Sequence, residues 1–167
     1  MEATRCVTPA AQYHSVNPWV LRAILKVESG FNPSAINRNP NNTVDVGIAQ
    51  MNSMHFKELQ QYGVAPGHLL DGCIATYVAA WHLAKQMRAH GNTWFGIAAY
   101  HSATPCFNTR YAGLLWNALV DMGAIAGARI RVKSLEQCGF VGVKSNRPNG
   151  RKAGGGSGVT AIAFDAD

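Results

Sequence analysis

The sequence predicts a mainly α-helical protein, with a single compact helical domain over residues 1–140 and a Gly-rich basic tail over residues 141–167. Three observations predict this class. Apolar residues recur at helical spacing in several segments between about residues 9 and 127. Asn, Asp and Pro stand where such segments begin, and Gly stands where most of them end. Residues 144–158 have linker composition, so we expect the tail to be disordered.

The first strongly patterned helix lies between Asn17 and Gly30. Asn17 is a favourable N-cap, Pro18 suits the first helical position, and Gly30 suits the C-terminal stop. At 3.6 residues per turn, Glu28 ends the apolar face formed by Leu21, Ile24 and Leu25. Burial there would raise the pKa of its carboxyl group, as a general acid requires. The alternative is an ordinary helix-end Glu that bends back to water.

The remaining elements follow from the same signals. Residues 31–46 are rich in Asn and Pro and are expected to form a loop, and residues 47–52 are too short and mixed to classify. Further helices are expected over residues 53–62, 71–90, 92–100 and 108–123, with Pro105 ending the third. Beyond Gly127, the partial alternation of Ile130, Val132 and Leu135 allows a short strand.

The composition limits the classes of protein to consider. A chain of 167 residues suits one domain with a real core, and no apolar run is long enough to span a bilayer. The net charge of +6 favours anionic partners, although a basic tail explains the late cluster of Lys and Arg equally well. We expect no nucleic-acid partner, because no recognisable binding module is present.

The four cysteines and the N-terminus leave the cellular compartment open. There is no Cys-x-x-Cys pair and no His-Glu-x-x-His motif, so we expect neither a metal nor a cofactor. Two disulfides in any of three pairings, or four buried thiols, fit the count. Residues 1–6 lack the apolar region of a signal peptide, which fits a cytosolic protein or an exported protein in its mature form.

Polar groups occur beside small residues in three short segments. These segments are Glu28-Ser29, residues 47–52 and residues 99–102. A sugar-cleaving cleft needs this mixture: an acid that protonates the leaving oxygen, amides that hold hydroxyl and N-acetyl groups, and a Tyr that orients the acid.

The same segments resemble a known family. Residues 23–33, 47–52 and 98–102 are similar to motifs of the goose-type-lysozyme-like soluble lytic transglycosylases, and the resemblance covers about residues 6–125. The segments Tyr62-Gly63-Val64 and Leu70-Asp71-Gly72-Cys73 further resemble the small members that accompany type III and type IV secretion, conjugation and pilus machines. The resemblance implies the lysozyme-like α+β superfamily and a sugar-binding cleft.

The resemblance also implies roles for individual residues. It makes Glu28 the catalytic acid and Ser29 its neighbour that positions it or the substrate. Gln50, Met51 and Asn52 would line the cleft, and Tyr100 would donate a hydrogen bond to Glu28. His101 replaces the Asn of the usual Ala-Tyr-Asn motif, and either sugar binding or packing would explain it.

Disulfides and location follow from the same resemblance. It implies a Cys6–Cys73 bond, as in secretion-linked members, and hence an exported, periplasmic location. Cys106 and Cys138 have no counterpart in the family, and a second bond between them is a hypothesis that neither the spacing nor the resemblance supports.

The implied function is cleavage of the bond between N-acetylmuramic acid and N-acetylglucosamine, with formation of a 1,6-anhydro ring. Such an enzyme would open peptidoglycan locally for a secretion, conjugation or pilus apparatus. Two alternatives stay open: a lysozyme-type hydrolase that uses Asp45 as its second carboxylate, and a non-catalytic wall-binding assembly factor.

Overall fold

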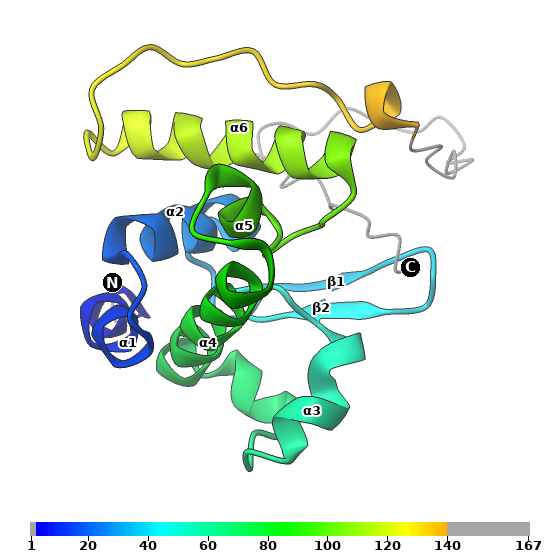
Figure 1. The fold of residues 1–167 in the computed structure, drawn as a ribbon. Coiled ribbons are helices and arrows are strands. Elements are labelled where there is room, and N and C mark those ends of the chain that lie inside the picture. The colour runs from blue at the N-terminus through cyan, green and yellow to red at the C-terminus, as the bar shows by residue number, and fades with distance from the viewer. Residues whose placement is uncertain (1–2, 140–167) are drawn as a thin grey trace, which may run out of the picture.

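The computed structural model describes residues 3–139, in which helices predominate and a small antiparallel sheet lies to one side (Figure 1). The mainly helical class is therefore confirmed. The Gly-rich tail over residues 141–167 lies outside the described residues. None of the described helices is both long and apolar enough to cross a membrane.

The helix that carries Glu28 has the boundaries that the sequence predicts. A 3-10 turn, η1 (Ala3–Cys6), leads into α1 (Val7–His14), and α2 (Pro18–Ser29) follows. The side chain of Asn17 accepts hydrogen bonds from the amides of Trp19 and Val20, which satisfies two free donors at the start of α2. Gly30 ends the helix in the left-handed conformation, at φ +61°.

A small sheet occupies the region expected to be a loop. It contains β1 (Ile36–Arg38), β2 (Val44–Val46) and β3 (Met51–Asn52) in the antiparallel order β1-β2-β3. Asp45 pairs with Asn37 on one side and Asn52 on the other. The loop expectation for residues 31–46 was wrong there, because strands of two or three residues are too short to show an alternating pattern.

The other helices match the predicted segments closely. The expected helix over residues 53–62 forms as η2 (Ser53–His55) and α3 (Phe56–Gln60). After η3 (Pro66–Leu70) come α4 (Gly72–His90), capped by Asp71, and α5 (Trp94–Ala98), capped by Thr93. The last helix, α6 (Pro105–Asp121), begins at Pro105 rather than Asn108, because Pro is favourable in the first turn of a helix.

The segment after α6 runs back along that helix to η4 (Glu136–Cys138), as the yellow and orange trace in Figure 1 shows. The suggested strand near Ile130 is absent from it. Instead of pairing with another strand, the backbone of Ile130 exchanges two hydrogen bonds with the Asn117 side chain, at 2.8 and 2.9 Å. A disulfide between Cys106 and Cys138 fixes the end of the segment to α6.

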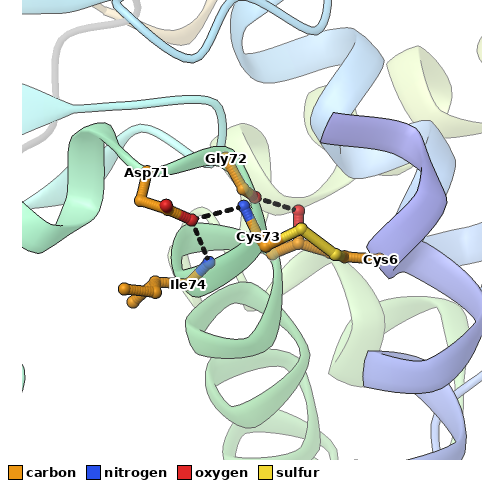
Figure 2. The surroundings of a disulfide bond; sticks show 6 residues. Cys6, Asp71, Gly72, Cys73 and Ile74 are labelled. Carbon is orange, nitrogen blue, oxygen red and sulfur yellow. Dashed lines mark hydrogen bonds between the residues drawn. A yellow bond between two sulfur atoms is a disulfide. The ribbon is translucent and has the colours of Figure 1, made fainter. Parts of the chain in front are cut away.

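Packing around α4 holds the domain together. The main core joins apolar residues of α1, α2, α4 and α6, including the fully buried Leu21, Leu83 and Leu115. A second cluster lies under the sheet and α3. The Cys6–Cys73 disulfide connects the start of α4 to η1, beside the N-cap bonds of Asp71 (Figure 2). The resemblance implied this pairing, and the structure contains it.

Candidate active site

Glu28 lies in the last turn of α2 with 5% of its surface exposed. Its Oε1 atom accepts a hydrogen bond of 2.5 Å from the hydroxyl group of Tyr111. Burial raises the pKa of Glu28 to about 8; the bond from Tyr111 opposes this shift, and the nearby charge of Asp45 adds to it. The carboxyl group is therefore protonated at neutral pH and placed to act as an acid.

Tyr111, from the middle of α6, holds the position that the resemblance assigned to Tyr100. The hydroxyl group of Tyr100 instead donates to the backbone oxygen of Ala49, at 3.1 Å. The expected hydrogen bond from Tyr100 to Glu28 is therefore replaced by one from Tyr111, whose ring is stacked beside that of Tyr100 with centroids 6.5 Å apart. Tyr100 still lines the same hollow as Glu28.

The segment 47–50 forms the tight turn between β2 and β3, and it packs against the end of α2. Ser29 donates from its hydroxyl group to the backbone oxygen of Ile48, at 2.7 Å. The side-chain amide of Gln50 donates hydrogen bonds to the backbone oxygens of Gly47 and Ala35. Its side-chain oxygen accepts a hydrogen bond from the side-chain amide of Asn37. Ser29 and Gln50 therefore connect α2, the turn and β1 beside the acid.

Asp45 and Asn52 face each other across the sheet. Asp45 is buried, and its two oxygens accept hydrogen bonds of 2.8 Å from Asn39 and Asn52. Burial raises its pKa, while these two bonds act in the opposite direction. Asp45 influences Glu28 electrostatically, but it lines neither of the hollows that contain Glu28.

His101 packs in the wall of the site. Its ring is stacked on Tyr111, with centroids 4.8 Å apart and planes 12° apart. Burial, together with the charge of Arg110, lowers its pKa to about 3, so the ring is neutral at physiological pH. The stacking shows that His101 packs against Tyr111. His101 also lines the hollow at Glu28, so that a contact between its ring and the substrate stays a prediction.

Sequence reasoning missed three residues of the site: Tyr111, His82 and His55. His82, on α4, donates from Nε2 to the backbone oxygen of Tyr100 at 3.0 Å, and the centroid of its ring lies 4.7 Å from that of His55. Burial lowers the pKa of both histidines. A signal for His82 existed, since it interrupts the apolar face of a long helix. No local signal distinguishes Tyr111 from a core tyrosine.

Two hollows flank Glu28. One, of about 50 Å³, is lined by Glu28, Gln50, Met51, Asn52, Met54, His55, His82, Tyr100 and His101. The other, of about 320 Å³, is lined by Glu28, Ser29, Asn32, Ser34, Ala35, Ile36 and Asn37. Together they bring Glu28 and its predicted partners Ser29, Gln50, Met51, Asn52, Tyr100 and His101 to one place.

A third hollow, of about 490 Å³, lies between α1, α3 and α4 and is lined mostly by aromatic and aliphatic side chains such as Tyr62, Tyr77 and Trp81. Of the predicted residues it contains only Cys73, which is held in a disulfide. We therefore place the site at Glu28, where a buried acid meets polar cavity walls.

Comparison with known families agrees with this placement. The family described as Transglycosylase SLT domain matches residues 5–112, which include every residue lining the two hollows at Glu28. The chain belongs to the transglycosylase SLT domain family. Within this SLT domain, the three motif segments correspond to the end of α2, the turn after β2 and the segment after α5.

Individual relatives share a third or more of the aligned residues with this SLT domain. The X polypeptide of Escherichia coli is 37% identical over 102 residues, 60% of this chain and 60% of that protein. The invasion protein IagB of Salmonella typhimurium is 33% identical over 116 residues, 66% of this chain and 72% of that protein. Protein IpgF of Shigella flexneri is 35% identical over 100 residues, 59% and 66% of the two chains.

Proposed function

We propose that this protein is a peptidoglycan lytic transglycosylase in which Glu28 is the single catalytic acid. The observation that carries the proposal is a buried carboxyl group, with a pKa of about 8, between two hollows of an SLT domain that amide, hydroxyl and imidazole side chains help to line. A group that is protonated at neutral pH can donate its proton to the oxygen that links two sugars.

One residue is sufficient for the proposed reaction. Glu28 gives its proton to the glycosidic oxygen as the bond to C1 of N-acetylmuramic acid breaks. The resulting carboxylate then takes the proton of the 6-hydroxyl group of the same sugar, whose oxygen forms the new bond to C1. The product carries a 1,6-anhydro ring, water does not enter, and Glu28 is protonated again.

The bonds of Asp45 disfavour a hydrolytic mechanism. A lysozyme-type hydrolase needs a second carboxylate that activates water or attacks the sugar. Both oxygens of Asp45 are bound by amides, and the residue lies outside the two hollows at Glu28. Asp45 acts on the site through its charge, which helps to keep Glu28 protonated.

We also propose that the protein works outside the cytoplasm, on the wall beside a transport or surface apparatus. Two disulfides within residues 3–139 support an oxidising compartment, because reducing systems keep cytosolic thiols free. Similarity to an invasion protein supports a link to such machinery. Its proposed partners are peptidoglycan glycan strands and components of that apparatus.

The deciding experiment is digestion of purified peptidoglycan, with mass spectrometry of the soluble products. We expect the wild type to release muropeptides that end in 1,6-anhydro-muramic acid, and Glu28→Gln to release none. Asp45→Asn, which keeps the size of the side chain, should retain the product type.

Products one water heavier, with reducing ends, would identify a hydrolase instead. Loss of those products in Asp45→Asn would then assign the second carboxylate to Asp45. Glycan binding without any cleavage by the wild type would favour a wall-binding role.

A further inference from the structure

The smaller hollow at Glu28 has a size and a lining that suit a small group with both apolar and polar parts. Its volume of about 50 Å³ holds roughly three to five groups the size of a water molecule, because each needs about 10–15 Å³. Met51 and Met54 give the hollow apolar surface, while His55 and His82 add imidazole rings beside the acid. The hollow therefore fits a substituent of a sugar ring rather than a whole ring.

Most hydrogen-bond donors in this lining are bound to the protein itself. The side-chain amides of Gln50 and Asn52 each donate two hydrogen bonds to neighbouring oxygens of the chain. The hydroxyl group of Tyr100 donates to the backbone of Ala49. His82 donates from Nε2 to a backbone oxygen, and because burial keeps its ring neutral, its other nitrogen is a bare acceptor. These side chains cannot donate to a ligand in the hollow without giving up a bond.

His55 differs from these side chains. Its ring forms no hydrogen bond with any residue between 3 and 139, and it is only partly buried, so a ligand can reach it. Burial, together with the charge of Lys85, lowers the pKa of His55, so the ring is neutral near pH 7 and carries one N–H group. The ring of His82 packs against it, with centroids 4.7 Å apart. His55 is thus a neutral donor held at the wall of the hollow.

The acetamido group of an N-acetylated sugar has the chemistry that this lining would recognise. Beyond the sugar ring it consists of a nitrogen, a carbonyl group and a methyl group, which suits the volume of the hollow. Its methyl group is apolar, and its carbonyl oxygen accepts a hydrogen bond. A carbonyl oxygen that enters a protein without finding a donor costs about 1–3 kcal/mol, so the donor decides whether the group binds.

We propose that the 50 Å³ hollow binds an acetamido group of the glycan, with the methyl group against Met51 and Met54 and the carbonyl oxygen bound by the ring N–H of His55. This inference rests on the proposed function, because it assumes that glycan strands occupy the site at Glu28. His55 is then a specificity residue for N-acetylated sugars, and Glu28 alone performs the chemistry.

The test is calorimetric binding of tetra-N-acetylchitotetraose, a neutral ligand with an acetamido group on every sugar, to the full chain carrying Glu28→Gln. In this protein, His55→Phe keeps a ring but removes the N–H group, while His55→Gln keeps an N–H donor. We expect the Kd to rise about tenfold in His55→Phe and less than about threefold in His55→Gln. His90→Phe is the matched control, because His90 is exposed at the end of α4 and lines neither hollow at Glu28, and it should leave the Kd unchanged.

Nuclear Overhauser spectroscopy locates the acetamido group in the same complex. We expect contacts between an acetyl methyl group of the ligand and the methyl groups of Met51 and Met54. Contacts with Ala35 and Ile36 alone would place the acetyl groups in the 320 Å³ hollow and overturn the proposal.

Two results of the binding measurement would also overturn it. An unchanged Kd in His55→Phe removes His55 from recognition, and equal weakening in His55→Phe and His55→Gln shows that the shape of the ring, not its N–H group, is what matters. Because the binding protein lacks the catalytic acid, both results are independent of the products that the wild type makes. If Glu28→Gln does not bind the oligosaccharide, the pocket assignment is wrong, and digestion of peptidoglycan by the wild type decides separately whether the proposed function stands.

Discussion

The ionisation of Glu28 shows how a single buried residue links stability to chemistry. In an unfolded chain this carboxyl group would lose its proton near pH 4.5, and in the folded protein it keeps the proton to about pH 8. Between those values the folded state binds more protons than the unfolded state. The free energy of unfolding therefore falls as pH rises through this window.

The first prediction concerns this pH dependence. Glu28→Gln removes the titrating group, so we expect the variant to be more stable than the wild type above pH 4.5, by a margin that grows up to about pH 8. The margin should reach a few kcal/mol. Urea unfolding of both proteins from pH 4 to 9 measures it.

His82 and His101 change the stability in the opposite direction to Glu28. Comparing the wild type with Glu28→Gln at each pH cancels this contribution, because both proteins contain both histidines. Their lowered pKa values reduce stability as pH falls below about 6.5 in both proteins alike. A margin that does not change with pH would mean that Glu28 titrates normally.

The second prediction concerns Tyr111, whose hydroxyl group fixes one oxygen of Glu28. Tyr111→Phe keeps the ring stacked on His101 but removes a hydrogen bond to the acid. Loss of such a bond is worth about 1.5–3 kcal/mol, so we expect kcat to fall roughly 10- to 100-fold. The alkaline limb of the pH profile should move to higher pH, because the bond lowers the pKa of Glu28.

The matched control is Tyr100→Phe, which removes a hydroxyl group bound to the Ala49 backbone instead. It should leave the position of the alkaline limb unchanged. A shift of that limb in Tyr100→Phe but not in Tyr111→Phe would restore the role that the resemblance gave to Tyr100.

At the scale of elements, the turn between β2 and β3 brings the cavity wall to the acid. Gly47 begins this turn at φ +80°, and a Cβ atom there would lie 1.9 Å from the backbone oxygen of Leu69. The close approach packs the turn against η3, and the bond from Ser29 to Ile48 holds it on α2. These contacts hold the turn that carries Gln50 into the hollow that it shares with Met51 and Glu28.

The third prediction tests this packing. Gly47→Ala should lower the free energy of unfolding by roughly 3 kcal/mol or more, since it combines a strained backbone with a clash against main-chain atoms. Gly63→Ala is the control: Gly63 has a similar φ of +77° but open space around its added methyl group, so about 1 kcal/mol is expected. Denaturant unfolding compares the two, and equal losses would show that the contact with Leu69 is unimportant.

At the scale of the whole molecule, two disulfides join parts that are distant in sequence. Cys6–Cys73 spans 67 residues and ties η1 to α4, while Cys106–Cys138 spans 32 and fixes the segment that returns along α6. Each bond restricts the unfolded chain more than the folded one, which stabilises the native state.

The fourth prediction is that Cys6→Ala with Cys73→Ala lowers the free energy of unfolding by about 4 kcal/mol, the chain-entropy value for a loop of this length. Unreduced wild-type protein should label no thiol at any of its four cysteines. Denaturant unfolding and thiol counting measure the two. Free labelling of Cys6 and Cys73 would contradict both the bond and the proposed oxidising compartment.

The sequence by itself determined the helices and the place of Glu28 at the end of an apolar face, because these depend on local patterns. Asn17, Asp71 and Thr93 are caps whose side chains bond amides two or three residues away, and the spacing of α2 places Glu28 on the apolar face of its own helix. The chain order of the three motifs supplied Gln50 and Met51 through resemblance. The cap and face signals lie within one or two turns of chain, and each of the three motifs is itself a short segment.

Only the tertiary structure decided which groups meet the acid. The bond between Tyr111 and Glu28 joins residues 83 apart, and His82 reaches Tyr100 from a different helix. None of the three short strands shows a pattern of its own; in the folded chain their backbones pair, and Asn39 and Asn52 donate hydrogen bonds to Asp45 of the central strand. Burial, which raises the pKa of Glu28, is a property of the packed molecule, since many distant segments must combine to exclude water.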